Sequence, residues 1–432
     1  MPPSEAGLTA HSYYEATAER PASAPPLMGR IAADVAIVGG GYAGLSAALE
    51  LGSRGYSVAL LEARRIGWGA SGRNGGQVLV GFAGLDAIER QLGKADARRC
   101  WDMSIEGVRL VGERIARFGI DCDHQRGHLT LATKPRRGAE LARLVEHLAK
   151  DYGYELQLVP HAQIGEWIAS PRFHSGAFDG FSGHLHPLKY CLGLARAAQQ
   201  TGTRLYENTS ALRIEQGIKT TVKTEQGEVS CDFVVLAGNV YLNDFGDISR
   251  DLAHRIVRIG TFMVATDPVD DEVNTGELIR HRASAFDNNL LLDYFRVSAD
   301  ERLLFGGADV FRGPPPADIA EHLRSRIGQV FPQLKHVPIA YAWGGFVDAS
   351  INGAPDFGRI GPQVYYLQGF SGHGVALSGL AGKLVAEAIA GQSERLDVFA
   401  QLKHMRFPRL KRVRDAAVGL AAFYYRLHDR ML

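Results

Sequence analysis

The turn at residues 39–44 constrains the fold of this chain more than any other feature. Its sequence, GGGYAG, contains the pattern G-x-G-x-x-G. It follows the short apolar segment DVAIV (34–38), which is typical of a buried parallel strand. A helical pattern at 45–55 comes next, and a second apolar segment, SVALLE, ends at residue 62. The order of strand, glycine turn, helix and strand predicts a βαβ unit, which excludes an all-helical or all-β fold.

Each glycine of the turn has a physical task if the unit binds a dinucleotide. Gly39 would allow the tight turn, Gly41 would let the backbone approach a pyrophosphate, and Gly44 would let the helix pack close to the strand. The helix N-terminus offers unpaired N–H groups to the phosphates. Glu62 lies at the end of the second strand, 23 residues after Gly39, where it would accept hydrogen bonds from ribose hydroxyls. Its carboxylate would repel a 2′-phosphate, so we expect FAD or NAD rather than NADP.

Further glycine-rich segments favour FAD. The chain has 50 glycines in 432 residues, and many gather at 39–44, 67–76, 344–345 and 369–374. This spread suits a long ligand that several backbone segments approach closely. No second G-x-G-x-x-G directly follows an apolar strand and opens a helix, as a nicotinamide site would require. We therefore expect an organic substrate to reduce the flavin directly.

The remaining patterns predict an α/β chain (α+β overall), with a Rossmann-like FAD-binding domain and a substrate domain built on an antiparallel sheet. Segment 256–310 alternates in a β manner and supplies that separate sheet. Further helices are predicted at 84–118, 137–150, 188–202 and 375–391, and further strands at 204–207, 211–216, 219–225, 232–238 and 363–369. The predicted FAD-binding domain comprises 31–95, 183–245 and 338–398, and the substrate domain comprises 96–182 and 246–337. Residues 1–30 are expected to form an arm on the surface, and 399–432 a basic helical tail.

Charge and composition exclude several classes of protein. There are 48 Lys and Arg against 47 Asp and Glu, so the chain lacks the large net positive charge that would attract nucleic acid. We find neither an apolar run long enough to span a bilayer nor a secretory signal, and the four cysteines are scattered without metal-ligand spacing. We therefore expect a cytoplasmic protein with no metal site. The tail from residue 401 carries eight Lys and Arg against two Asp. Its packing over the FAD-binding domain is favoured over docking on a membrane surface.

Blocks of sequence over nearly the whole chain resemble the D-amino-acid-oxidase-like FAD oxidoreductases, which include glycine oxidase and sarcosine oxidase. Within that family the sequence is most similar to those of the γ-glutamylputrescine oxidoreductases. The blocks are SYYEATA (12–18), DVAIV to GGQ (34–77), GHLHPLKYCLGLARAAQQTG (183–202), LLDYFRV (291–297), RLLFGGA (302–308), WGGFVDASINGAPDFGRIG (343–361) and YYLQG to IAG (365–391).

The resemblance implies a set of FAD contacts. The first turn would hold the pyrophosphate, Glu62 and its successors would face the adenosine, and the segment from Ser71 would run toward the flavin ring. A helix N-terminus near His373 would stabilise the negative charge of reduced flavin at N1. The implied contacts are Gly39, Gly41, Ala43, Gly44, Glu62, Ala63, Arg64, Ser71, Arg73, Gly75, Gly76, Gln77, Ala211, Ala237, Gly238, Gly372, His373 and Gly374.

Departures from the family pattern carry information about cofactor and substrate. Members that bind FAD covalently use a histidine beside the position of Trp68 or a cysteine near the C-terminus, and here Gly69 follows Trp68 and no cysteine follows Cys231. Noncovalent FAD is therefore expected. The basic residue that holds a substrate carboxylate in sarcosine oxidases is replaced by Ala376, which favours an amine whose carboxylate is remote or absent. The strand RLLFGGA lacks the lysine that speeds the reaction with O₂ in those enzymes, yet O₂ remains the expected acceptor.

Four side chains are candidates for the substrate pocket, each with a structural role as the alternative. Alternation places Tyr294 and Arg296 on one face of a strand, where they could box an amine and pair with a distant carboxylate. Trp343 precedes a Gly-Gly pair, and His373 lies inside the last glycine turn. No obligatory base is needed for a neutral amine. Structural roles are predicted instead for His184, His186, Asp348, Ser350, Asn352 and Asp356.

Together these features predict an oxidoreductase acting on CH–NH or CH–NH₂ donors. The predicted activity is oxidative deamination of γ-glutamylputrescine or a related small amine to an aldehyde, ammonia and H₂O₂, by hydride transfer to flavin N5. One alternative is a glycine, sarcosine or D-amino-acid oxidase of the same fold. Another is an amine dehydrogenase that passes electrons to a quinone or carrier protein. A third is a non-enzymatic flavoprotein.

Overall fold

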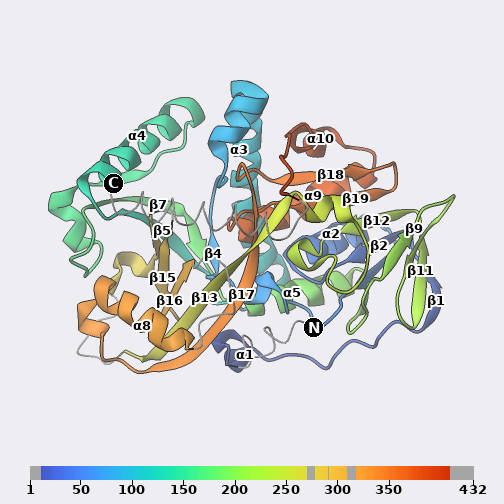
Figure 1. The fold of residues 1–432 in the computed structure, drawn as a ribbon, viewed down its shortest axis with the longest axis horizontal. Helices are drawn as coiled ribbons and strands as arrows, with labels where there is room; N and C mark the ends of the chain where they lie inside the picture. Colours follow the sequence, from blue (N-terminus) through green and yellow to red (C-terminus); the bar gives the residue numbers. More distant parts are fainter. Residues whose placement is uncertain (1–10, 270–277, 290, 309–317, 409–432) are drawn as a thin grey trace.

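The computed structural model describes residues 11–269, 278–289, 291–308 and 318–408. Two large sheets stand side by side, with the long helix α3 (Leu85–Phe118) rising at their junction (Figure 1). Most of the predicted basic tail, 409–432, lies outside the described residues.

The first large sheet contains the predicted βαβ unit. Its strand order is β18-β19-β12-β2-β3-β8, and all pairings are parallel except that of β18 with β19. Its central strands are fully buried, because helices cover the sheet, and this explains their continuous apolar sequence. The strands are β2 (Val35–Val38), β3 (Val58–Leu61), β8 (Arg204–Tyr206), β12 (Phe233–Leu236), β18 (Asp356–Ile360) and β19 (Val364–Gln368), and the associated helices are α2 (Tyr42–Ser53), α5 (Pro187–Gln200), α9 (Gly374–Ile389) and α10 (Glu394–Ala400).

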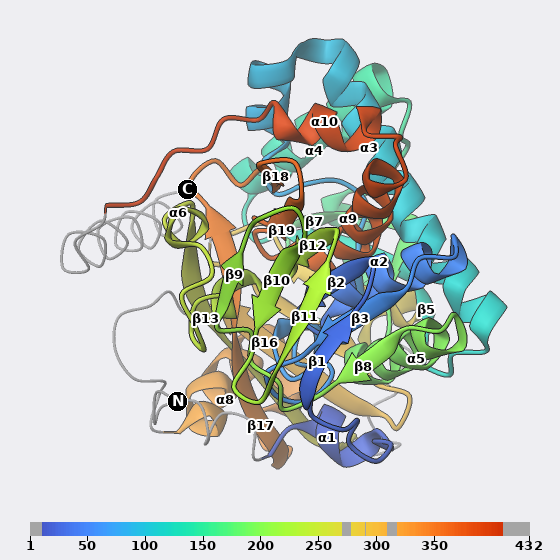
Figure 2. The ribbon, with the colours of Figure 1, turned by 90° about the vertical axis from the view of Figure 1, so that its right-hand side faces the viewer.

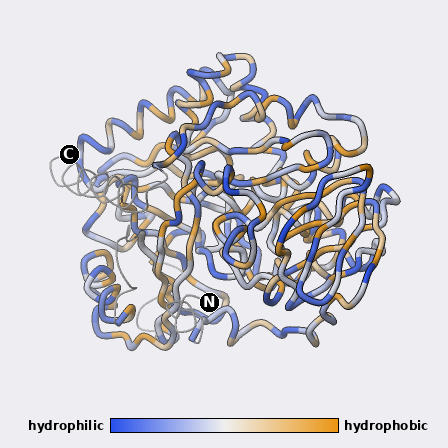
Figure 3. Tube along the Cα trace, turned by 45° about the vertical axis from the view of Figure 1, so that its right-hand side comes forward, coloured by the Kyte–Doolittle hydropathy of each residue, from blue (hydrophilic) through white to orange (hydrophobic). Residues whose placement is uncertain are grey.

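Close packing around α2 explains one glycine of this helix and one of α9. A Cβ on Gly44 would lie 2.0 Å from the carbonyl oxygen of Gly39, so no other residue fits there. A Cβ on Gly382 of α9 would lie 2.5 Å from the carbonyl oxygen of Ala43. The end of β2, α2 and α9 are therefore in close backbone contact with one another. Figure 3 shows apolar chain running through this interior, whereas polar and apolar segments alternate along the outer helices.

The second large sheet has nine strands in the order β17-β13-β16-β15-β14-β5-β7-β4, with β6 also paired to β7. The predicted antiparallel sheet is confirmed, with one difference: β14 and β5 pair in parallel. Its strands are β4 (Gln77–Val78), β5 (Gln125–Ala132), β6 (Gln157–Val159), β7 (Ser175–His184), β13 (Ile256–Pro268), β14 (Ser284–Asp287), β15 (Asp293–Val297), β16 (Arg302–Ala308) and β17 (Ile339–Ser350). Helix α8 (Ile319–Val330) covers one face, and α4 (Pro135–Tyr152) lies near β7 (Figure 1).

A third, four-stranded sheet lies at the right-hand edge of the molecule in Figure 1 and faces the viewer in Figure 2. It consists of β9 (Arg213–Glu215), β10 (Thr220–Lys223), β11 (Gly227–Cys231) and β1 (Gly29–Ala32). Strand β1 comes from the end of the predicted N-terminal arm and pairs in parallel with β11. The end of the arm is thus part of a sheet.

The expectation of an arm lying only on the surface is wrong for helix α1 (Tyr13–Thr17). Its Tyr13 and Tyr14 are buried, and Tyr14 is 0% exposed. The Tyr14 ring packs edge-on against Trp343, with centroids 5.1 Å apart. Large aromatic rings gain stability when they leave water, which explains why this segment inserts rather than remaining on the surface.

The predicted division into domains stays a prediction. Residues 338–398 supply β17 to the nine-stranded sheet as well as β18 and β19 to the six-stranded sheet. In the described part of the chain, no single helix has both the length and the apolar character to cross a bilayer. The pair α9 and α10, bent by 118°, reaches the required length and composition only when both helices are taken together.

Candidate active site

A cavity of roughly 1210 Å³, counting its open mouth, lies at the carboxyl ends of β2, β3 and β12. Ligands of open parallel sheets bind at this edge. The lining extends from the first glycine turn to the start of α9, so the cavity suits an extended ligand. Of the predicted FAD contacts, Gly39, Gly41, Ala43, Glu62, Ala63, Ser71, Ala211, Ala237, Gly238, Gly372 and Gly374 line it.

The first glycine turn forms one wall of the cavity. Gly39 has φ +114°, and a Cβ there would lie 2.6 Å from the carbonyl oxygen of Ala237. Gly41 is the N-cap residue of α2 and has no side chain to cap the helix. The Tyr42 N–H donates to Oγ of Ser71 at 3.1 Å. The N-terminus of α2 therefore faces the cavity with one of its N–H groups held by Ser71, and this end of the helix suits a pyrophosphate.

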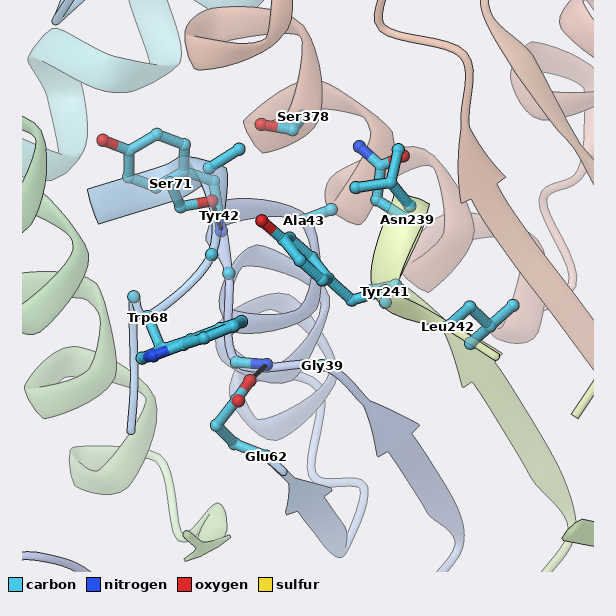
Figure 4. A pocket seen from close by; sticks show the side chains of 18 of the residues that line it. Gly39, Tyr42, Ala43, Glu62, Trp68, Ser71, Asn239, Tyr241, Leu242 and Ser378 are labelled. Atoms are coloured by element: carbon cyan, nitrogen blue, oxygen red, sulfur yellow. Dashed lines mark hydrogen bonds between the residues drawn. The ribbon is translucent and has the colours of Figure 1, made fainter. Parts of the chain in front are cut away.

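Glu62 lies beside the glycine turn and lines the cavity with it (Figure 4). Its Oε2 accepts from Gly40 N–H at 2.7 Å and its Oε1 from Arg64 N–H at 2.8 Å. Burial raises the pKa of Glu62, although these two N–H groups act in the opposite direction. Each carboxylate oxygen has a second lone pair that remains for ribose hydroxyls.

Two aromatic rings that the sequence interpretation missed also line the cavity. Trp68 and Tyr241 meet edge-on with centroids 5.2 Å apart (Figure 4). The Arg73 guanidinium lies over Trp68 at 4.3 Å. The position of Tyr241 carried a usable signal, because residues directly after a parallel strand, here β12, lie at the ligand edge of the sheet. Asn239 belongs to the same missed segment.

The N-terminus of α9 faces the far end of the cavity, where Gly372 and Gly374 line the wall. Asp348 holds this turn: it accepts hydrogen bonds from the N–H groups of Gly369, of Phe370 at 2.9 Å and of Ser371 at 3.1 Å. Burial raises the pKa of Asp348, and the three N–H donors oppose that effect. The predicted capping role of Asp348 is therefore confirmed.

Two helix N-termini, those of α2 and α9, thus open into one cavity, and in neither helix does the N-cap residue make a side-chain cap. Each end carries partial positive charge. A ligand with a phosphate group near one end and a ring that gains negative charge near the other fits this arrangement. FAD has both groups, and the residues present fit it.

His373 precedes α9 but does not line the cavity. Its Nε2–H donates to the carbonyl oxygen of Val80 at 3.3 Å. Burial lowers the pKa of His373 and so favours its neutral ring. Of the other predicted FAD contacts, Gly44 serves helix packing and Arg64 lies 5.2 Å from the Phe245 ring. Arg73, Gly75, Gly76 and Gln77 form the strand and turn that lead to the second sheet.

Arg296 and Trp343 hold the turn at 73–76 through its carbonyl groups. Arg296 Nε–H donates to the Gly75 carbonyl oxygen at 2.9 Å. Its Nη2 donates to the Leu185 carbonyl oxygen at 3.1 Å and to Oη of Tyr14 at 3.3 Å. Trp343, 0% exposed, donates from Nε1 to the Arg73 carbonyl oxygen at 3.0 Å. These contacts support the cofactor side of the site, whereas the sequence suggested substrate contacts.

Tyr294 lies against the same turn. A Cβ on Gly75 would be 2.9 Å from its ring, and its hydroxyl lies 2.7 Å from Oγ1 of Thr261. Arg296 also borders a second cavity beside His184 and the loop 121–125. The structure thus brings Tyr294, Arg296 and Trp343 to one turn, and the assignment of substrate contacts to them stays a prediction.

Comparison with known proteins identifies a family of FAD-dependent enzymes, in agreement with the cavity described above. The model of a family described as FAD dependent oxidoreductase matches residues 34–388. A probable oxidoreductase, OrdL, of Haemophilus influenzae is 40% identical over 423 residues, 97% of each chain. The γ-glutamylputrescine oxidoreductase of Escherichia coli is 39% identical over 427 residues, 98% of this chain and 100% of that one.

Solved structures share the fold at lower identity. Glycine oxidase from Geobacillus kaustophilus superposes with a TM-score of 0.70 at 22% identity, covering 87% of this chain and 99% of that one. L-proline dehydrogenase from P. horikoshii gives a TM-score of 0.69 at 22% identity, covering 87% and 96%. The predicted fold, a Rossmann-like FAD-binding domain with a second sheet, is confirmed.

Proposed function

The chain belongs to the FAD dependent oxidoreductase family, as an enzyme acting on CH–NH donors, and from this we propose that it oxidises γ-glutamylputrescine or a closely related γ-glutamylated amine. The overall change is R–CH₂–NH₂ + O₂ + H₂O → R–CHO + NH₃ + H₂O₂. The observation that carries the proposal is 39% identity, over 98% of this chain and all of the other, to an oxidoreductase named for that substrate.

The described residues support a division of labour within the cavity. Gly39 and Gly41 would let the pyrophosphate approach the N-terminus of α2, and Glu62 would accept hydrogen bonds from the ribose. The N-terminus of α9 would stabilise negative charge on the reduced ring. When bound, FAD supplies the hydride acceptor. Noncovalent binding is consistent with the four cysteines, which are buried and do not line the cavity.

The test is anaerobic reduction of the purified yellow protein. γ-Glutamylputrescine is compared with putrescine, sarcosine, glycine and D-alanine, and bleaching of the visible flavin absorbance is recorded for each. We expect the glutamylated amine to bleach the flavin at the lowest concentration. Bleaching by the small amino acids in preference to it would contradict the proposed substrate class.

The electron acceptor is tested separately. We propose O₂, so an oxygen electrode should record O₂ consumption and peroxide formation at a rate that matches turnover. Rapid reduction of a quinone or dye with negligible O₂ consumption would assign the chain to the amine dehydrogenases instead. The electron acceptor needs this separate test because β16 (Arg302–Ala308) lacks the lysine that speeds the reaction with O₂ in sarcosine oxidases.

A further inference from the structure

The second cavity, which Arg296 borders, lies between the C-terminal end of α3 and the turn that joins β15 to β16. Its volume is roughly 980 Å³, counting its open mouth. Besides these two segments, the end of β7 and Arg282 contribute to its lining. None of its lining residues lines the FAD cavity, and the proposed function does not use it.

The second cavity carries charges of both signs, and most of them are paired. Its charged residues are Asp121, Asp123, Arg282, Arg296 and Glu301. Arg282 pairs with Glu301 at 2.9 Å, and Asp123 pairs with Lys189 at 3.0 Å. Burial lowers the pKa values of the two histidines of the lining, His124 and His184, and so favours their neutral rings. Arg296 and Asp121 are therefore the charges left without an ionic partner among the described residues.

Arg296 is a buried cation that forms no ion pair with a carboxylate of the described residues. The residue is 3% exposed, and its three hydrogen bonds go to uncharged oxygens. Asp300, in the β15–β16 turn, is engaged elsewhere, since it pairs with Arg302 at 2.8 Å. Buried charges in proteins are almost always paired, so an unpaired guanidinium that borders a cavity indicates an anionic ligand.

One nitrogen of this guanidinium remains for a ligand. Nε and Nη2 make the three hydrogen bonds, whereas Nη1 makes none with the described residues. Nη1 is also not enclosed, because the enclosed side-chain nitrogens without partners all belong to other residues. It therefore keeps accessible surface, and the cavity that Arg296 lines is the second one. Nη1 thus offers charged N–H donors to a ligand in this cavity, and such donors form strong hydrogen bonds with anions.

The acidic residues of the lining restrict the charge of that anion. Asp121 is exposed, follows the end of α3 and has no partner among the described residues. Asp123 and Glu301 border the same cavity. A ligand with two negative charges, such as inorganic phosphate, would be repelled by these carboxylates more than a ligand with one. A carboxylate has one negative charge, and an ammonium group on the same molecule would be attracted to Asp121.

We propose that the second cavity is a separate ligand site, which binds the carboxylate of a small monocarboxylate at Nη1 of Arg296. The inference does not depend on the proposed substrate. Two sources share this chemistry: a simple carboxylic acid, and an amino acid whose ammonium group faces Asp121. Since Nε–H of Arg296 also holds the Gly75 carbonyl oxygen, one guanidinium would connect this ligand to the turn predicted to carry the flavin.

The test measures binding of four probes to the FAD-loaded full chain by calorimetric titration at low salt. Isobutyrate has the carboxylate alone, 2-aminoisobutyrate has a carboxylate and an ammonium group, and tert-butylamine has the ammonium group alone. Inorganic phosphate is the fourth probe. Neither amine probe has a hydrogen on the carbon that bears its nitrogen, so neither can reduce the flavin as an amine substrate would.

Three variants test the assignment: Arg296→Met, Arg296→Lys and Asp121→Asn. The matched control for the last is Asp86→Asn. Asp86 is likewise exposed, lies at the other end of α3 and lines neither cavity.

We expect isobutyrate to bind and tert-butylamine not to bind. Arg296→Met should weaken isobutyrate about tenfold or more, the effect of losing one charge-assisted hydrogen bond, and Arg296→Lys should recover part of the affinity. Asp121→Asn should bind isobutyrate about two- to threefold more tightly, because one repelling surface charge is removed, and Asp86→Asn should bind it like the wild type. Tighter binding of 2-aminoisobutyrate than of isobutyrate would identify amino acids as the source of the ligand, and the reverse order would identify simple carboxylic acids.

Absence of carboxylate binding, or tighter binding of phosphate, would overturn the proposal. Unchanged isobutyrate affinity in Arg296→Met or in Asp121→Asn would also overturn it, because the carboxylate would then bind elsewhere, and so would an equal gain in Asp86→Asn. If Arg296→Met fails to fold, Asp121→Asn decides alone, since a gain in affinity cannot come from unfolding. The proposed function is judged separately, by reduction of the flavin with amines.

Discussion

Substitution of Gly41 by alanine tests whether the first turn is built for close approach of a phosphate. Gly41 has φ −93°, which alanine adopts without strain. The new Cβ would lie 2.8 Å from Oγ of Ser71. That hydroxyl accepts the Tyr42 N–H at 3.1 Å, so it must rotate away and the bond is lost. The damage is therefore steric and local.

Two magnitudes follow from this geometry. Loss of one neutral hydrogen bond costs the apoprotein about 1 kcal/mol. The methyl group also stands where a phosphate oxygen must meet the N-terminus of α2, and loss of one charge-assisted bond, about 1.5–3 kcal/mol, raises the FAD dissociation constant roughly 10- to 100-fold. FAD affinity should thus respond more strongly than stability.

The assay is titration of apoprotein with FAD, followed by flavin fluorescence, together with unfolding of the apoprotein. Gly55→Ala is the control, since Gly55 ends α2 with φ +87° and nothing lies near its Cβ, so only stability should fall. Ser71→Ala removes the same bond as Gly41→Ala. The double variant should therefore cost about 1 kcal/mol rather than about 2. Unchanged FAD affinity in Gly41→Ala, or strict additivity, would refute the reasoning.

Three further outcomes are expected. Glu207→Gln should lose about 2 kcal/mol at pH 7, because its carboxylate accepts from Ile66 N–H at 2.6 Å and Ala24 N–H at 2.9 Å. Burial acts to raise the pKa of Glu207, but these hydrogen bonds outweigh it, so the pKa in the folded state is depressed. The stabilisation by Glu207 is therefore lost as the pH falls through that depressed pKa, and the thermal unfolding curves of wild type and variant should converge there. Tyr14→Ala should cost about 3–5 kcal/mol in thermal unfolding by emptying the space beside Trp343, and Tyr14→Phe far less. Acid precipitation should leave the yellow colour in the supernatant, and a yellow pellet would contradict noncovalent FAD.

Local patterns predicted the first βαβ unit to within a residue or two at most ends. The strand expected at 34–38 is β2, Val35–Val38, and the strand expected to end at residue 62 is β3, Val58–Leu61. The start of α2 was wrong: the helix begins at Tyr42, not at 45. The glycine pattern overlaps the first helical turn, because Gly44 must lie inside the helix to pack against Gly39.

Pairings between distant segments could not be predicted. The parallel pairing of β14 with β5 joins residues more than 150 positions apart, as in Ser284 with His128. Neither strand carries a local pattern that names its partner, since register depends on how whole faces pack. The same reason hid the insertion of Tyr14, whose partners Trp343 and Arg296 come from β17 and β15.

The two sides of the site differ in what a sequence can reveal. The predicted cofactor contacts are made largely by the backbone. Glycines such as Gly39 and Gly41 mark where the backbone turns tightly or approaches a ligand closely, so the sequence reveals these places. The substrate side is made of side chains that meet across strands, so alternation assigns a face but not a partner. Arg296 illustrates the difference: it does point toward the site, yet its donors hold the Gly75 carbonyl oxygen. A strand that could contact substrate thereby also fixes the turn predicted to carry the flavin, so substitutions on β15 should alter substrate choice and flavin properties together.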